Sequence, residues 1–430
     1  MDLRDVITVS PRGISKTFNF SSSNLVDSGL FFEESQSVTW DVSNISRIFA
    51  AEKSRLLSFS AVNGSSSAIK CSSYEADESD SIGLSTTNDL LVAGRSSGKV
   101  YLINLLDFSL KSELPVAKNL SICKAYSNYM ICGGRDVLFS VWDLEKSQAP
   151  IFTSKNVRPD ALDLKVPIWV SDASFVEGYE NRLFVTSSKY GDFCIYDLRS
   201  GQRRPVSRSA WRVSNKQGKK SVGTGHNPAM LRDLTVTRPI TRCVAYTSAP
   251  GVGLKAVAAN AIGDICRLDF RVPHVSLISD EEAEKKRKAR SVGARAPEPP
   301  NYVLGYMPPS LGSVSALVCG GAGCANLPHA MPGANINNQP VVVSASLDRY
   351  IRVYHRDTGE LINKIFTKAP VSTFLIRESA IIPLIANNEE GTKNAEKEEQ
   401  DAAVEDGDVW EQMETLEEPP LKRTKKVTQK

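Results

Sequence analysis

One pattern recurs along the chain: a short apolar strand ending in small residues, a tight turn with Gly or Asp, and an alternating strand. The copies begin at Val6, Ile48, Leu90, Tyr129, Arg182, Leu254 and Val341. Early copies lie roughly 40 residues apart, the spacing of blades in WD-type propellers. Each copy matches the middle hairpin of a four-stranded blade. The sequence therefore predicts an all-β fold, a seven-bladed WD40-like β-propeller with long loop insertions and a disordered C-terminal tail.

The residues within each copy suit the crowded geometry of a propeller. The first strand is apolar throughout, as expected between neighbouring blades, and ends in small pairs such as Ala93-Gly94 and Gly133-Gly134. After the last copy, residues 360–367 are predicted to finish the last blade. Residues 369–376 are predicted to supply the inner strand of the first blade, which has no strand before it. Pairing the two ends would remove open sheet edges.

Domain boundaries follow from composition. Residues 1–386 are assigned to the propeller, with insertions at about 201–231, 272–300 and 320–339. Residues 387–430 form a tail that is acidic, then basic, and poor in core-forming residues, so it is expected to be disordered by itself. Within it, the apolar residues at helical spacing predict a short amphipathic helix that docks on a partner or on its own propeller. These residues are Val409, Trp410, Met413 and Leu416.

Positive charge is segregated, although the formal net charge is only +3. The 201–231 stretch has no acidic residue, and it contains Arg203, Arg204, Arg208, Arg212, Lys216, Lys219 and Lys220. With Trp211 among them, the stretch fits contact with a phosphate backbone and stacking on a base; a solvated loop is the alternative. Two further clusters resemble nuclear-localisation signals or nucleic-acid patches. They are Lys285, Lys286, Arg287 and Lys288, and Lys422, Arg423, Lys425 and Lys426.

The stretch 155–172 looks like neither regular strand nor helix. Pro159 and Pro167 forbid a regular helix because each lacks a donor N–H. Charged and large apolar residues alternate there, and Trp and Arg often anchor interfaces. The candidate contact residues are Lys155, Arg158, Leu162, Asp163, Leu164, Pro167 and Trp169. The alternative is a long connection whose apolar residues fold back onto the core.

Signals for chemistry are absent from the sequence. It has no phosphate-binding loop, no nucleophile elbow and no dinucleotide fingerprint, so we expect no enzyme activity and no cofactor. The eight cysteines include no Cys-x-x-Cys pair. Cys319, Cys324 and His329 cluster locally but lack a fourth metal ligand, so reduced structural thiols are expected. With no signal peptide and no membrane-length apolar run, we expect a soluble intracellular protein without a membrane partner or a small-molecule substrate.

Several of these stretches resemble a known family. The residues are Lys155–Arg158, then Leu162-Asp-Leu-Lys-Val-Pro-Ile-Trp, then Gln202-Arg-Arg-Pro-Val, and Leu347-Asp-Arg-Tyr-Ile-Arg-Val. They are similar to the nucleolar WD-repeat ribosome-assembly factors of the NSA type, from about Leu90 to Arg377. The resemblance implies a seven-bladed scaffold in nucleolar biogenesis of the large (pre-60S) subunit and in rRNA processing. It also implies binding to pre-rRNA and assembly factors, release by an AAA-type ATPase, and a link to the exosome helicase.

Two other functions share features of this sequence. A WD40 adaptor of a nuclear protein-only complex, such as a ubiquitin ligase or chromatin complex, would have the same propeller and nuclear signals. A propeller enzyme, such as a glycoside hydrolase or lactonase, would need carboxylates or a metal at the central channel. The insertions also look longer than the family pattern, so the resemblance does not fix which surface is basic.

Overall fold

The computed structural model describes residues 6–20, 25–31, 37–44, 46–60, 65–87, 89–146, 149–159, 163–214, 235–249, 252–270, 302–321, 323–324, 335–377 and 380–383. The chain divides into two units, Met1–Ile385 and Ala386–Lys430, and every described residue lies in the first. The tail helix and both nuclear-localisation-like clusters therefore lie outside the described residues.

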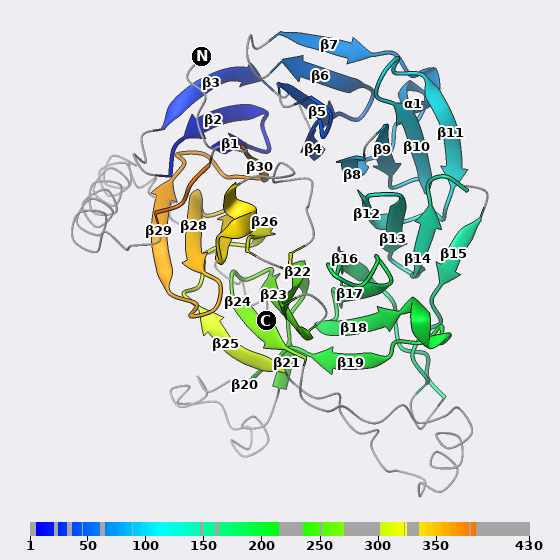
Figure 1. The fold of residues 1–430 in the computed structure, drawn as a ribbon, viewed down its shortest axis with the longest axis vertical. Helices are drawn as coiled ribbons and strands as arrows, with labels where there is room; N and C mark the ends of the chain where they lie inside the picture. Colours follow the sequence, from blue (N-terminus) through cyan, green and yellow to red (C-terminus); the bar gives the residue numbers. More distant parts are fainter. Residues whose placement is uncertain are drawn as a thin grey trace, which may run out of the picture. The chain divides into compact units, whose positions relative to one another are not determined.

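The described residues form seven four-stranded antiparallel sheets arranged in a ring (Figure 1). From the outside inwards, the first sheet is β3 (Val26–Phe31), β2 (Ile14–Phe18), β1 (Val6–Val9) and β30 (Thr373–Ile376). From the inside outwards, the next sheets along the chain are β4 (Ser37–Trp40), β5 (Arg47–Ala51), β6 (Leu56–Ser60), β7 (Ser66–Ile69); and β8 (Ser81–Thr86), β9 (Leu90–Arg95), β10 (Lys99–Asn104), β11 (Leu110–Pro115). A short helix, α1 (Ser72–Glu75), connects these two sheets.

The remaining four blades follow the same order, from inner to outer strand. They are β12 (Leu120–Tyr126), β13 (Tyr129–Gly134), β14 (Val137–Asp143), β15 (Pro150–Thr153); β16 (Val170–Phe175), β17 (Leu183–Ser188), β18 (Asp192–Asp197), β19 (Ser207–Ala210); β22 (Ile240–Ala249), β23 (Val252–Asn260), β24 (Ile265–Asp269), β25 (Val303–Met307); and β26 (Val314–Cys319), β27 (Val341–Ser346), β28 (Tyr350–His355), β29 (Leu361–Phe366). Separately, β20 (Arg212–Ser214) pairs with β21 (Thr235–Thr237), and the described residues include 3-10 turns at Leu198–Ser200 and Asn335–Asn338.

The predicted propeller and its closure are confirmed. Each of the seven repeated hairpins forms the second and third strands of a blade. The ring closes where β1 pairs with β30, in the register Val6 with Ile376 and Val9 with Thr373. Residues from the two ends of the described chain thus share one sheet, and β29 is the outer strand of the last blade, as predicted.

Small residues are required where blades meet. A Cβ added to Gly134 would lie only 2.1 Å from the carbonyl oxygen of Asn119, and one on Gly133 would touch Val170 of the next blade. The hydrophobic core consists of clusters that each combine strands of adjacent sheets. The inner strands enclose a central cavity of about 120 Å³.

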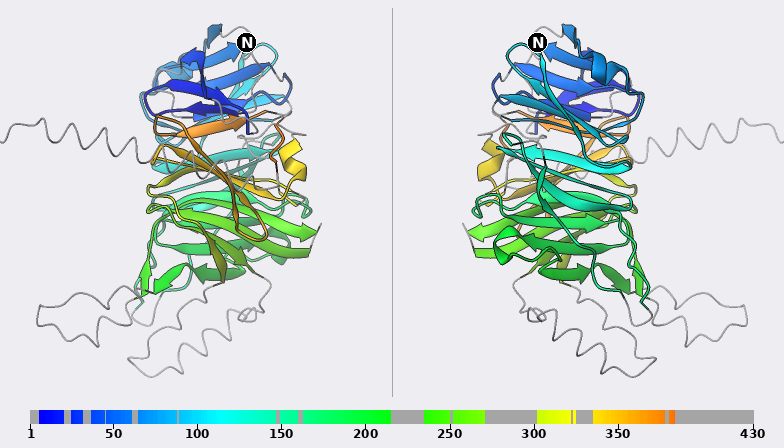
Figure 2. Two further views of the ribbon diagram at one scale, coloured as in Figure 1. Left: turned by 90° about the vertical axis from the view of Figure 1, so that its left-hand side faces the viewer. Right: turned by 90° about the vertical axis from the view of Figure 1, so that its right-hand side faces the viewer.

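The ring has two faces, seen from the side in Figure 2. In a blade that meanders from inner to outer strand, the turn after the second strand lies at the same end as the connection into the next blade. We call this end the Trp169 face. It carries the turns 135–136, 189–191, 261–264 and 347–349 and the connections 154–169 and 308–313. The other end is called the opposite face.

The predicted insertion at 201–231 is wrong at its start. Strand β19 lies within it and completes a blade, because Ser207–Ala210 pair with β18. The part from 215 to 231 lies outside the described residues, as do 272–300 and much of 320–339. No helix among the described residues is long and apolar enough to span a membrane. The same part of the chain contains no group of three or more potential metal ligands, and its cysteines are unpaired thiols.

Candidate interaction surface

The connection between β15 and β16 is held on the Trp169 face by its own backbone. Asp136 N donates to the carbonyl oxygen of Ile168 over 2.9 Å, and Lys189 N donates to that of Trp169 over 3.0 Å. Within the connection, Asn156 Nδ2 donates to Val166 O over 2.7 Å. These bonds tie the segment to the turns of two neighbouring blades, so its position is set by the fold.

Trp169 lies between a cation and a second aromatic ring. The Arg135 guanidinium carbon is 5.0 Å from the Trp169 ring centroid, and the Tyr190 ring meets it edge-on at 6.4 Å. Such contacts orient the indole while leaving it half-buried. Of the other predicted anchor residues, Asp163, Leu164 and Pro167 are exposed on the same connection, and Leu162 lies outside the described residues. Composition and residue spacing did not point to Arg135 or Tyr190.

The structure brings two predicted basic residues together at the boundary between two blades. Lys155 N donates to Arg203 O over 2.7 Å, and Arg203 Nε donates to Thr153 O over 2.7 Å. Lys155 and Arg203 are exposed, and Arg158 and Arg204 are partly exposed. We call these four residues the basic rim.

The other predicted basic residues are placed differently. Arg208 Nη2 pairs with Asp192 Oδ2 at 2.7 Å on the outer strands of its blade. The backbone of Arg212 belongs to β20, whose side chains are not described, and Lys219 and Lys220 lie outside the described residues.

The prediction that Trp211 is available for base stacking is wrong. Its side chain is buried in the core between two blades, and its Nε1 donates to the Tyr306 hydroxyl over 3.4 Å. A buried indole can neither leave the core without loss of packing nor reach a base. Among the described residues, the tryptophan that is partly exposed is Trp169.

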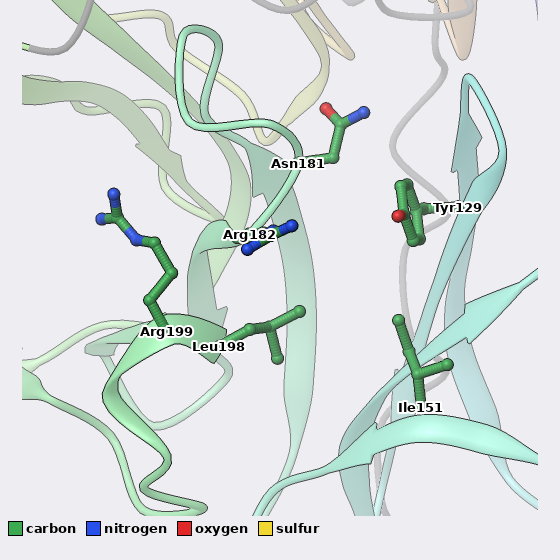
Figure 3. Close-up of a pocket in the computed structure, with 6 residues that line it drawn as sticks. All are labelled: Tyr129, Ile151, Asn181, Arg182, Leu198 and Arg199. Atoms are coloured by element: carbon green, nitrogen blue, oxygen red, sulfur yellow. The ribbon is translucent and has the colours of Figure 1, made fainter.

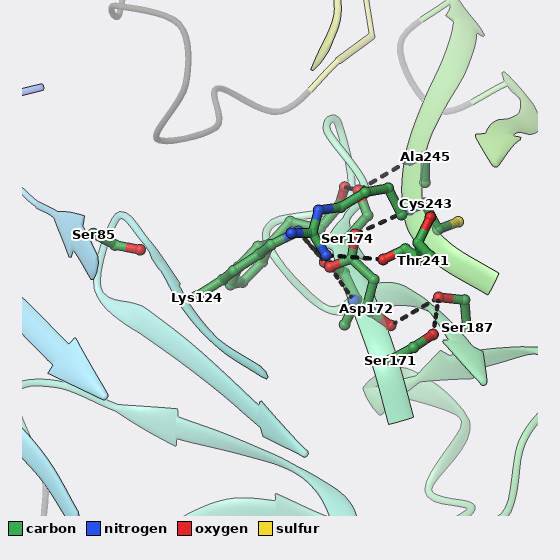
Figure 4. A network of polar contacts seen from close by, with 12 residues as sticks. Ser85, Lys124, Ser171, Asp172, Ser174, Ser187, Thr241, Cys243 and Ala245 are labelled. Carbon is green, nitrogen blue, oxygen red and sulfur yellow. Dashed lines mark hydrogen bonds and ion pairs between the residues drawn. The ribbon is translucent and has the colours of Figure 1, made fainter. Parts of the chain in front are cut away.

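Sequence reasoning missed a polar network at the central cavity (Figure 4). Asp172 Oδ1 accepts from Lys124 Nζ at 2.5 Å, and Oδ2 accepts from Cys243 N at 2.9 Å. One carboxylate therefore joins β12, β16 and β22. Burial, with the nearby Arg242 charge, lowers the pKa of Lys189. Asp172 is the one acidic residue among the described residues that line the cavity.

A second cavity opens on the opposite face, between the blade of β12–β15 and the blade of β16–β19 (Figure 3). It measures about 200 Å³ and is lined by Tyr129, Ile151, Asn181, Arg182, Leu198 and Arg199. The Arg199 guanidinium already donates two hydrogen bonds to the Asp197 carboxylate, over 2.9 and 2.7 Å. The residues that line this cavity include no pair of carboxylates for acid–base chemistry.

Comparison with known proteins identifies relatives of this chain. Human WD repeat-containing protein 74 is 25% identical over 253 residues, and the mouse protein is 24% identical over 302 residues. The ribosome biogenesis protein NSA1 of Yarrowia lipolytica is 22% identical over 364 residues, which cover 80% of this chain and 73% of that protein. WD repeat-containing protein 74 and NSA1 are homologues of this chain.

The similarity to these homologues is broad but partial. The matched regions cover 59% and 68% of this chain, and the chain spans only 46% of the human protein and 59% of the mouse protein. No family model matches the chain. Among solved structures, the computationally designed Ika8 protein superimposes with a TM-score of 0.51 at 12% identity, over 85% of this chain and 84% of that one. This last likeness concerns the fold alone.

Proposed function

We propose that this protein is a non-enzymatic scaffold in assembly of the large ribosomal subunit, in the nucleolus. The homology to NSA1, a protein named for ribosome biogenesis, carries the proposal because it extends over 80% of the chain. On this proposal the propeller binds pre-rRNA and neighbouring assembly factors. An AAA-type ATPase releases it, and the exosome helicase acts on the same particle.

The Trp169 segment supplies an apolar anchor in this proposal. Trp is among the residues that most often dominate binding energy, and its geometry here is fixed before a partner arrives. Leu164 and Pro167 extend the exposed apolar surface along the same connection. A pre-formed anchor of this kind suits a scaffold, because little side-chain freedom is lost on binding.

The basic rim supplies charge in the proposal. Its four residues come from connections of two blades, and the backbones of Lys155 and Arg203 are hydrogen-bonded to each other. Clustered cations of this kind contact RNA phosphates or an acidic protein surface, and such contacts weaken as salt increases.

Charge reversal tests the role of the basic rim. Replacing Arg203→Glu together with Arg204→Glu should release the tagged protein from large-subunit precursors, because two attractive charges become repulsive. The matched control is Lys111→Glu with Lys118→Glu, two exposed lysines on another blade. Both double variants should keep the wild-type melting temperature. Unchanged co-purification of precursors with the Arg203→Glu, Arg204→Glu protein would refute this role.

A further inference from the structure

Large apolar side chains protrude from consecutive turns of the Trp169 face. Tyr190 is 41% exposed, Ile262 53%, Leu311 88% and Leu347 48%. They belong to three successive blades, at the turns β17–β18, β23–β24 and β27–β28 and the connection β25–β26. We call these four residues the apolar row. Contiguous exposed apolar side chains on a soluble protein commonly mark an interaction site.

The members of the row are neighbours because their turns are bonded to one another. Leu311 N donates to Asp348 Oδ2 over 3.0 Å, and Leu347 N donates to Ser313 O over 3.1 Å. Ser310 N donates to Gly263 O over 2.9 Å, which places the turn of Ile262 beside the connection that holds Leu311. The three aliphatic side chains thus rise from one bonded group of turns.

Tyr190 continues the row towards Trp169. A Cβ on Gly191 would lie 2.9 Å from Thr237 Cβ, so the Tyr190 turn touches the segment that leads into β22. In that segment, Arg238 Nη1 lies 2.5 Å from Asp264 Oδ2. Asp264 belongs to the turn that carries Ile262, so this ion pair links the two turns. On its other side, Tyr190 packs edge-on against Trp169. The row is therefore continuous with the anchor described above.

The turns are held in place by polar side chains, so the exposure of the row is imposed by the fold. Asn260 Oδ1 accepts from the backbone N–H groups of Ile262, Gly263 and Asp264, each over 2.9 Å. Asp348 Oδ1 likewise accepts from Tyr350 N over 3.1 Å. A rigid apolar surface loses little conformational freedom on binding, which favours association.

The side chains of the apolar row favour a protein partner over a nucleic-acid partner. Three of its four members are aliphatic and offer no ring on which a base could stack. The acids within it are already engaged, because Asp264 pairs with Arg238 and Asp348 with Arg352 at 2.7 Å. Arg349, which is exposed in the turn that carries Leu347, forms no ion pair with any residue that the structure describes. The complementary surface is consequently aliphatic with flanking negative charge.

We propose that the apolar row is the docking site for a segment of another protein that presents aliphatic side chains flanked by carboxylates. This goes beyond the proposed function, because it specifies the class of partner at one face and holds whether or not that partner belongs to a pre-ribosomal particle.

Site-specific photo-crosslinking in cells tests the proposal. Benzoylphenylalanine replaces Leu347 in one full-length protein and Leu106, which is 94% exposed on the opposite face, in a control protein. Irradiation should link position 347, but not 106, to one stretch of another protein with aliphatic and acidic residues. The yield should fall at least tenfold when Ile262→Ser and Leu311→Ser are added. Adducts to RNA, to residues 387–430, to a second copy of this chain, or to a basic stretch would overturn the proposal.

A synthetic peptide of the crosslinked stretch gives an independent measurement. Its affinity for the purified protein should fall at least tenfold in Ile262→Ser with Leu311→Ser, and also when its acids are replaced by amides. The matched control is Leu106→Ser with Ile381→Ser, which removes comparably exposed side chains elsewhere. Equal affinity of the two double variants, at unchanged melting temperatures, would refute the proposal. A crosslinked partner found only outside ribosome precursors would refute the proposed function and leave this inference standing.

Discussion

Replacing Asp172 with alanine should destabilise the propeller more than any exposed charge change. The Asp172 side chain is 3% exposed and that of its partner Lys124 18%. Removing the carboxylate leaves the Lys124 ammonium buried without its counterion, which costs about 3–5 kcal/mol. It also leaves Cys243 N–H without its acceptor, at a cost of about 1–3 kcal/mol. The sum is an upper bound, since the two losses share one side chain.

Thermal unfolding measures the effect. For domains of 150–250 residues, 1 kcal/mol corresponds to roughly 2–4 °C, and larger domains shift less, so Asp172→Ala should lower the melting temperature by roughly 5–10 °C. Glu113→Gln is the control, because Glu113 pairs with Lys99 at 2.8 Å on the surface. This exposed pair should contribute little, so the control should shift the melting temperature by about 1 °C or less.

A double replacement separates the two causes. Lys124→Met combined with Asp172→Leu removes both charges, so most of the lost stability should return. The remaining deficit should be about 1–3 kcal/mol, because Cys243 N–H still lacks an acceptor. The reasoning fails if Asp172→Ala melts within 1 °C of the Glu113→Gln control, or if the double variant is less stable than Asp172→Ala.

Three further predictions follow from particular residues. Burial raises the pKa of Tyr74 to about 12; the unfolded chain releases this proton near pH 10, so stability falls above pH 10. Between pH 7 and 11, Tyr74→Phe should therefore lose about 1 kcal/mol less stability than the wild type, measured by urea unfolding at both pH values; an equal loss would contradict this. Gly134→Ala should cost about 1–3 kcal/mol in the same assay, because its Cβ would strike Asn119 O, and an unchanged midpoint would count against that contact. Deleting residues 409–416 should remove a bound protein partner without changing the melting temperature, and an unaltered set of co-purifying proteins would refute the role assigned to the tail helix.

The sequence predicted the blades because a blade hairpin is local. Its two strands and turn lie within about 15 residues, and the periodicity of a half-buried strand is visible in any one copy. Closure was predictable for a related reason: residues 369–376 match one further strand beyond the last blade, and pairing it with the first hairpin removes open sheet edges. The pairing of Val6 with Ile376 confirms this.

The errors and omissions involve contacts between blades. Trp211 stands among Arg, Ser and Gly residues, which suggested a loop, but its side chain packs in a core cluster with Cys266 and Leu268 of a different sheet. Likewise, Lys124 and Asp172 are 48 positions apart on inner strands, which the repeat did not include. A single sequence gives no signal for such pairs. The connection carrying Trp169 was singled out by composition, but its partners Arg135 and Tyr190 became apparent only from the fold.

The most direct test of the proposed function is the sedimentation of the tagged protein from nuclear extract, with and without ribonuclease. A scaffold of large-subunit assembly should migrate with large-subunit precursors and should leave those fractions after ribonuclease treatment. Migration as a small complex that resists ribonuclease would contradict the proposal and would instead indicate an adaptor in a protein-only nuclear complex.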